Sequence, residues 1–135
     1  MQQDIDITEF DSVKACEQGH TFELLAGDGV TPTGVKLIVI GKHADVVRAY
    51  VNDVISEGVR EATIAARKGK APVPKTPDEN RQAAIDWAAS RVIGWFGVRQ
   101  AFTADLLRNA LRRNPHWIDQ ITEESDNLAN FSTAQ

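Results

Sequence analysis

The pattern of apolar and polar positions divides the chain into a β-rich first third and a helical remainder. Residues 21–25 alternate apolar with polar side chains, and residues 35–40 form a run rich in β-branched residues that ends at Gly41. The stretch between these two runs contains several glycines and a proline, which are typical of turns. The pattern therefore predicts a β-hairpin over residues 21–41 with a loose loop at its tip.

The middle of the chain holds two stretches in which apolar residues recur at helical spacing. The first predicts a long helix over residues 45–69, with Asp45 as its N-cap and Gly69 as its stop. The second predicts a helix over residues 77–96, which begins with a capping box at Thr76. Three prolines within the basic segment 70–77 favour an extended surface link between these helices.

Two further helices are predicted towards the C-terminus. Thr103 is a suitable N-cap for a helix over residues 103–113, and Asn114 followed by Pro115 both ends that helix and starts the last one. The apolar run at 92–98 is assigned to the end of the second predicted helix, and Gly97 is expected to close that helix. Aromatic side chains dominate the energetics of cores, so Trp95 and its neighbour Phe96 are expected to be packing anchors.

Together these elements predict an α+β fold that is mostly helical, with an N-terminal β-hairpin followed by about four α-helices. The 135 residues suit a single domain, 1–135. Within it we expect an acidic N-terminus and hairpin over 1–42, a long helix over 43–69, the basic link over 70–77 and C-terminal helices over 78–135.

Charge is distributed unevenly along the chain. Residues 1–30 contain seven acids and one base, whereas residues 31–113 contain fourteen bases and eight acids. Such asymmetry fits a basic nucleic-acid-binding face or acidic ends that pack beside a basic middle. The overall acidic pI, near 5.3, favours the second interpretation and argues against nucleic acid as a partner.

The composition offers little support for catalysis or metal binding. The three histidines are far apart in sequence, and Cys16, the single cysteine, is expected to be a small buried apolar residue. We therefore expect no enzymatic activity, no metal and no cofactor. No apolar run is long enough to cross a membrane, and the acidic start lacks the pattern of a signal peptide, so a cytoplasmic location is expected.

The order of several short motifs resembles that of the tail assembly chaperone family of long-tailed bacteriophages. These motifs span nearly the whole chain and are Glu9-Phe10-Asp11-Ser12-Val13, Phe22-Glu23-Leu24, Gly34-Val35-Lys36-Leu37-Ile38-Val39-Ile40-Gly41, Gly94-Trp95-Phe96-Gly97-Val98, Phe102-Thr103, Leu107 or Leu111, Asn114-Pro115 and Asn130-Phe131. The chain resembles the short form of the family, made without ribosomal frameshifting. One departure is segment 99–101, which is shorter than the glycine-containing loop that many members have there.

The resemblance implies a protein that binds the long helical tape measure protein, keeps it soluble and promotes tail tube assembly, without remaining in the virion. It also implies contact with the tail tube protein and self-association, in the cytoplasm of a bacterial host. Apolar side chains of the predicted second, third and fourth helices are the candidate client contacts: Trp87, Trp95, Trp117, Leu107 and Ile121. The alternatives are a structural head–tail or tail-completion protein, and a small DNA-binding regulator.

Overall fold

The computed structural model describes residues 4–131 and confirms an α+β fold that is mostly helical. The first three residues of the acidic N-terminus and the last four of the chain lie outside the described part. Three antiparallel strands form one sheet in the order β1 (His20–Leu25), β2 (Pro32–Val39) and β3 (Val92–Phe96). The described helices are the 3-10 helices η1 (Ile7–Glu9) and η2 (Leu128–Phe131), and the α-helices α1 (Ser12–Glu17), α2 (Asp45–Arg67), α3 (Pro77–Ala89), α4 (Ala104–Arg113) and α5 (His116–Asp126).

The predicted hairpin is confirmed, and its loop is more ordered than expected. β1 and β2 pair with Phe22 opposite Leu37. In the loop, the Asp28 carboxylate accepts hydrogen bonds from the hydroxyl and backbone N–H of Thr31 and from the backbone N–H of Val30. Because these bonds favour the charged form, they lower the pKa of Asp28 to about 2.

The prediction for the apolar run at 92–96 is wrong, because this segment is strand β3 and not the end of a helix. Helix α3 ends at Ala89, and Trp95 then lies opposite Leu37 of the central strand. A short run of valine, isoleucine and aromatic residues suits a strand as well as a buried helical turn, so periodicity alone cannot separate them. The backbone of β2 decides the matter, since the hydrogen-bonding groups on its second edge pair with residues 92–96.

Gly97 also has a role other than the expected helix stop. It follows β3 with a φ of +75°, a conformation that side chains rarely adopt. A Cβ atom at this position would lie 2.2 Å from the carbonyl oxygen of Gly34. Gly97 therefore allows the end of β3 to lie directly against the start of β2.

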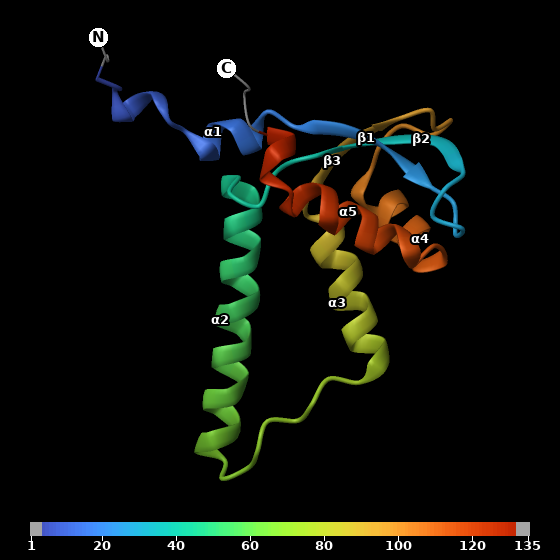
Figure 1. The fold of residues 1–135 in the computed structure, drawn as a ribbon. Helices are drawn as coiled ribbons and strands as arrows, with labels where there is room; N and C mark the ends of the chain where they lie inside the picture. The colour runs from blue at the N-terminus through green and yellow to red at the C-terminus, as the bar shows by residue number, and fades with distance from the viewer. Residues whose placement is uncertain (1–3, 132–135) are drawn as a thin grey trace.

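The core lies between the sheet and the helices α3, α4 and α5, which lie together on one side of it (Figure 1). Its buried members come from all of these elements and from α1, the first turn of α2 and η2. They are Cys16, Leu24, Leu37, Val39, Ile40, Ala44, Val47, Ile85, Ala88, Ala89, Val92, Leu107, Leu111, Ile121 and Phe131. The expectation that Cys16 is a buried apolar residue is confirmed.

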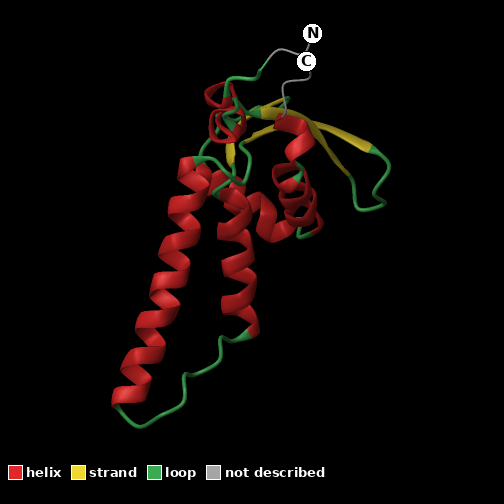
Figure 2. Cartoon of the chain, turned by 60° about the vertical axis from the view of Figure 1, so that its left-hand side comes forward, coloured by secondary structure: helices red, strands yellow, loops and turns green. Residues whose placement is uncertain are grey.

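Helix α2 leaves this body and extends away from it, roughly alongside α3 but much longer (Figures 1 and 2). Val47 in its first turn is its one buried residue. Its predicted stop is confirmed at Gly69, which has a φ of +68°. Its predicted N-cap is wrong, because Ala44 holds that position without a side-chain hydrogen bond.

The predicted starts of the next two helices are confirmed, and that of the last is shifted. Thr76 forms the capping box of α3, and the Thr103 side chain accepts a hydrogen bond at the start of α4. The side-chain amide of Asn114 donates instead to the carbonyl of Ala110, which closes α4. Pro115 is consequently the N-cap of α5 and not its first residue.

Replacing Gly97 by alanine is expected to destabilise the protein by about 3 kcal/mol or more, through both φ strain and a clash with Gly34. Gly29→Ala is the matched control, because Gly29 also has a φ of +75° but has no atom within 4 Å of the added Cβ. The control should cost roughly 1 kcal/mol. Urea unfolding measures both values, and equal losses would contradict a close approach of β3 to β2.

Candidate interaction surfaces

Trp95, one of the candidate client contacts, is held inside the fold by two interactions. Its ring packs edge-on against Phe102, with 5.1 Å between ring centroids. Its indole N–H donates to the carbonyl of Gln100 at 2.8 Å. These contacts join β3 to the segment before α4, so Trp95 serves packing at this corner.

The other two tryptophans are also half-buried and joined to neighbouring elements. Trp87 packs edge-on against Tyr50, with 6.0 Å between ring centroids, which connects α3 to α2. Burial, and then the nearby Asp86 carboxylate, raise the pKa of Tyr50. The indole N–H of Trp117 donates to the carbonyl of Leu25 at 3.1 Å, which connects α5 to β1.

The remaining two candidate contacts, Leu107 and Ile121, do not lie on a surface. Leu107 is 2% exposed and Ile121 is fully buried, and both belong to the core cluster. Their apolar periodicity marks the inner faces of α4 and α5. These two residues are therefore corrected from client contacts to core residues.

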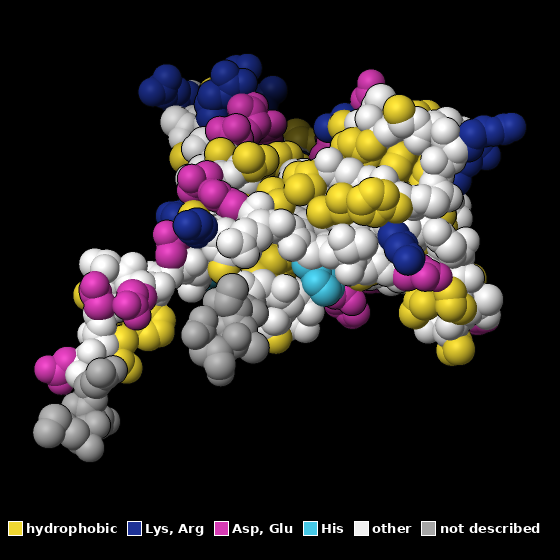
Figure 3. All heavy atoms as spheres, turned by 90° about the horizontal axis from the view of Figure 1, so that it is seen from above, with side chains coloured by type: hydrophobic (Ala, Val, Ile, Leu, Met, Phe, Trp, Pro, Cys, Tyr) yellow, Lys and Arg dark blue, Asp and Glu magenta, His cyan; other side chains and the backbone are white. Residues whose placement is uncertain are grey.

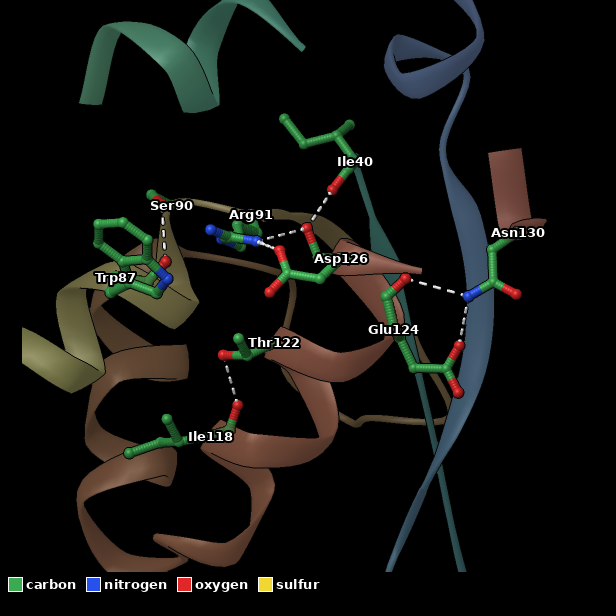
Figure 4. A network of polar contacts seen from close by, with 10 residues as sticks. Ile40, Trp87, Ser90, Arg91, Ile118, Thr122, Glu124, Asp126 and Asn130 are labelled. Carbon is green, nitrogen blue, oxygen red and sulfur yellow. Dashed lines mark hydrogen bonds and ion pairs between the residues drawn. The ribbon is translucent and has the colours of Figure 1, made fainter. Parts of the chain in front are cut away.

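Arg91 is a buried arginine between the end of α3 and the start of β3, and it contacts α5 and the residue that follows β2 (Figure 4). Its role was not predicted from the sequence. The Arg91 guanidinium forms an ion pair with Asp126 of α5 and donates to the Ser125 hydroxyl at 3.2 Å. That hydroxyl donates in turn to the carbonyl of Ile40 at 2.7 Å. The backbone carbonyl of Arg91 accepts from the N–H of Ile40 at 2.9 Å, so Arg91 is connected to Ile40 both directly and through Ser125.

This arginine is almost completely withdrawn from water, whereas its carboxylate partner is not. The side chain of Arg91 is 4% exposed and that of Asp126 is 46% exposed. The guanidinium carbon also lies 5.0 Å from the centre of the Trp87 ring, a favourable position for a cation. The signal in the sequence is a single base between two apolar pairs, Ala88-Ala89 and Val92-Ile93.

A row of exposed apolar residues runs along α2. We define the α2 stripe as Val54, Ile55, Gly58, Val59 and Ala62, all of them exposed. Ile55 and Val59 are each 60% exposed, although valine and isoleucine are normally buried. At helical spacing these positions fall in one sector that continues the row of Val47 and Val51, which pack on the body.

Beside the α2 stripe is an open groove of about 380 Å³ between α2 and the link that precedes α3. Val54 and Gly58 supply its apolar wall, and Asp53, Glu57 and Glu61 line its rim on α2. Lys75 of the link lines the opposite side. A Cβ at Gly58 would meet no atom within 4 Å, so the wall is open at this point.

A second apolar surface lies on the face of the sheet that the helices do not cover. Ile93 is 52% exposed and Phe96 is 56% exposed, so the expectation that Phe96 is a packing anchor is wrong. Figure 3 views the molecule from this side and shows hydrophobic side chains gathered on it. This patch is flat, whereas the α2 stripe is a long row beside a groove.

Metal-ligating side chains do not cluster at these surfaces in the described part of the chain. In the part of the chain that the structure describes, no group of three or more histidine, cysteine or acidic residues could hold a metal. The helices between residues 4 and 131 include none that is long and apolar enough to span a membrane. Comparison with protein-family models, with curated proteins and with solved structures gives no match.

Removing Asp126 is expected to destabilise the fold more than removing Arg91. Asp126→Ala leaves a buried guanidinium without its counter-charge, at a cost of about 2–3 kcal/mol. Arg91→Met removes the charge, retains an apolar stem and leaves a solvated carboxylate, so its cost should be less than half as large. Denaturant unfolding of the two variants tests the order, and a larger loss for Arg91→Met would contradict it.

Proposed function

We propose that this protein is a tail assembly chaperone of a long-tailed bacteriophage, and that it binds the helical tape measure protein through the α2 stripe. The order of short motifs along the chain favours this family. The observation that carries the proposal is the row of exposed apolar residues on a helix that leaves the body. An apolar client helix requires such a surface, because helix-in-groove recognition pairs one apolar face with another.

The shape of the α2 stripe supports a helical client in particular. Gly58 and Ala62 are one turn apart, and their small side chains allow another helix to approach closely. Val54, Ile55 and Val59 flank them and provide apolar area to bury. The stripe is long and narrow, as is suitable for a rod-like partner.

The arrangement of the helix supports reversible binding. Beyond its first two turns α2 has little of its apolar face packed on the body, although packing of an apolar face supplies most of the stability of helices in proteins. A client that covers the α2 stripe would stabilise the helix in the same step. Apolar surfaces exposed on both partners would then be removed from water together.

Co-expression with the tape measure protein encoded near the gene tests the proposal. Ile55→Ser combined with Val59→Ser should reduce the soluble client by more than about tenfold, because burial of each side chain contributes about 1.5 kcal/mol or more. Serine and these residues have similar helix propensities, so α2 itself should persist.

Val46→Ser is the control for this experiment. Val46 is 65% exposed on the same helix, but it precedes Ile55 by two and a half turns and so lies on the opposite side. It should leave the amount of soluble client unchanged. Equal losses for both variants, or no loss for either, would contradict binding through the α2 stripe.

Mass spectrometry of purified virions separates the proposed role from that of a structural tail or head–tail protein. An assembly chaperone should be present in infected cells and absent from mature particles. Stoichiometric presence in the particle would contradict the chaperone role and favour the structural alternative.

A further inference from the structure

A row of carboxylates borders the α2 stripe along one edge. We define the acidic row as Asp53, Glu57 and Glu61, all of them exposed. They follow one another at four-residue spacing, so they lie one above another on successive turns of α2. Each of them immediately precedes a residue of the α2 stripe in the sequence. The acidic row therefore runs parallel to the stripe along its whole length.

Most of the charge of the acidic row has no counter-charge among residues 4–131. Glu57 pairs with Arg60 at 3.0 Å, whereas no ion pair within the described chain involves Asp53 or Glu61. Carboxylates one helical turn apart repel one another, which weakens the helix in the free protein. A cation from a partner would remove this repulsion.

The groove beside the α2 stripe brings the apolar and acidic positions together in one surface. Its lining consists of Val54, Gly58, the acidic row and a single base, Lys75 of the link. Three carboxylates face one amine, so the groove is negatively charged. Its base takes part in no ion pair with a residue between 4 and 131.

The opposite edge of the α2 stripe is uncharged between residues 52 and 63. At helical spacing the side chains that border it there are Asn52, Ser56 and Thr63. The stripe is thus negative along one edge and neutral along the other. A helix that fits this surface needs matching asymmetry around its own apolar face.

We propose that the helix bound by the α2 stripe is basic along one edge, and that its lysine or arginine side chains pair with the acidic row while its apolar face packs on the stripe. This inference rests on the proposed function, because it specifies which segments of a client the stripe accepts. Burial of the two apolar faces would lower the effective dielectric constant around the new ion pairs. Their attraction would then exceed that of pairs in open water.

The acidic row opposes two other occupants of an exposed apolar helix face. Amphipathic helices that bind membranes are typically basic on their polar side, since many lipid headgroups are anionic. Nucleic acids are bound through basic residues, which neutralise their phosphates. Carboxylates beside the stripe would repel both of these polyanions. Charge complementarity therefore favours a basic protein helix.

Fluorescence anisotropy of three labelled peptides with the full chain tests the proposal. The peptides are amphipathic helices of about 20 residues, roughly 30 Å long, with the same apolar face. They differ along one edge, which consists of lysine, glutamine or glutamate. Affinity should fall in that order, with at least about tenfold between the first and the last at about 50 mM NaCl and about twofold or less at about 500 mM. Equal affinities at the lower salt concentration would overturn the inference.

Reversal of charge in the acidic row gives the sharper test. Asp53→Lys with Glu61→Lys should invert the order of the peptides, and α2 should persist because lysine has a high helix propensity. Asp119→Lys with Glu123→Lys is the matched control, since it makes the same change of net charge at two exposed positions of α5. The control should keep the wild-type order. Inversion in both variants would show an effect of net charge alone and overturn the inference.

The variant Ile55→Ser with Val59→Ser shows whether the peptides bind to the α2 stripe. It should bind the lysine peptide at least about tenfold more weakly than the wild-type protein does. Unchanged binding would place the peptide elsewhere and overturn the inference. If this variant also lost the soluble client while all three peptides bound the wild-type protein alike, the inference would fail and the proposed function would stand.

Discussion

One buried ion pair specifies how the body is arranged at the point where α3 ends and β3 begins. Arg91 is buried there, and it reaches Asp126 and Ser125 on α5 while its backbone pairs with Ile40 after β2. A buried guanidinium without partners is costly, so the chain is strongly biased towards the single arrangement in which these groups meet. The ion pair and its hydrogen bonds thereby fix the positions of β3, α5 and the end of β2 relative to one another.

The body around this ion pair is well packed, whereas most of α2 is not. The apolar residues of α3, α4 and α5 converge on the sheet and leave one side of it covered. Val47 is the one residue of α2 that is buried in that core, and Val51 packs against the core while partly exposed. Tyr50 adds a contact with Trp87 of α3. The remaining length of the helix keeps an apolar sector that no residue between 4 and 131 covers, and this sector is the basis of the proposed client binding.

Local signals in the sequence were sufficient for much of the fold. The alternation in β1, the capping box at Thr76 and the N-cap at Thr103 act over a few residues, and each was predicted correctly. β3 was not, because whether Val92–Phe96 forms a helical turn or a strand depends on β2, more than fifty residues earlier. Gly97 shows the same limit, since its need for a small side chain comes from the distant carbonyl of Gly34.

The candidate site was harder to predict for a related reason. Apolar periodicity identifies the face of a helix but not whether another part of the chain covers it. Leu107 and Ile121 are covered, whereas Ile55 and Val59, with equally regular spacing, are not. The three tryptophans were predicted as client contacts because they are large apolar groups, but each packs on or hydrogen-bonds to another part of the fold. The buried role of Arg91 could be recognised only after α5 was placed beside it.

Amide hydrogen exchange along α2 tests the central claim, that the outer part of this helix has no apolar partner within the described residues, 4–131. In the free monomer the amides of residues 53–67 should exchange much faster than those of α3 and β2, and they should become protected when the client is bound. Protection of residues 53–67 in the monomer equal to that of the sheet would contradict the account.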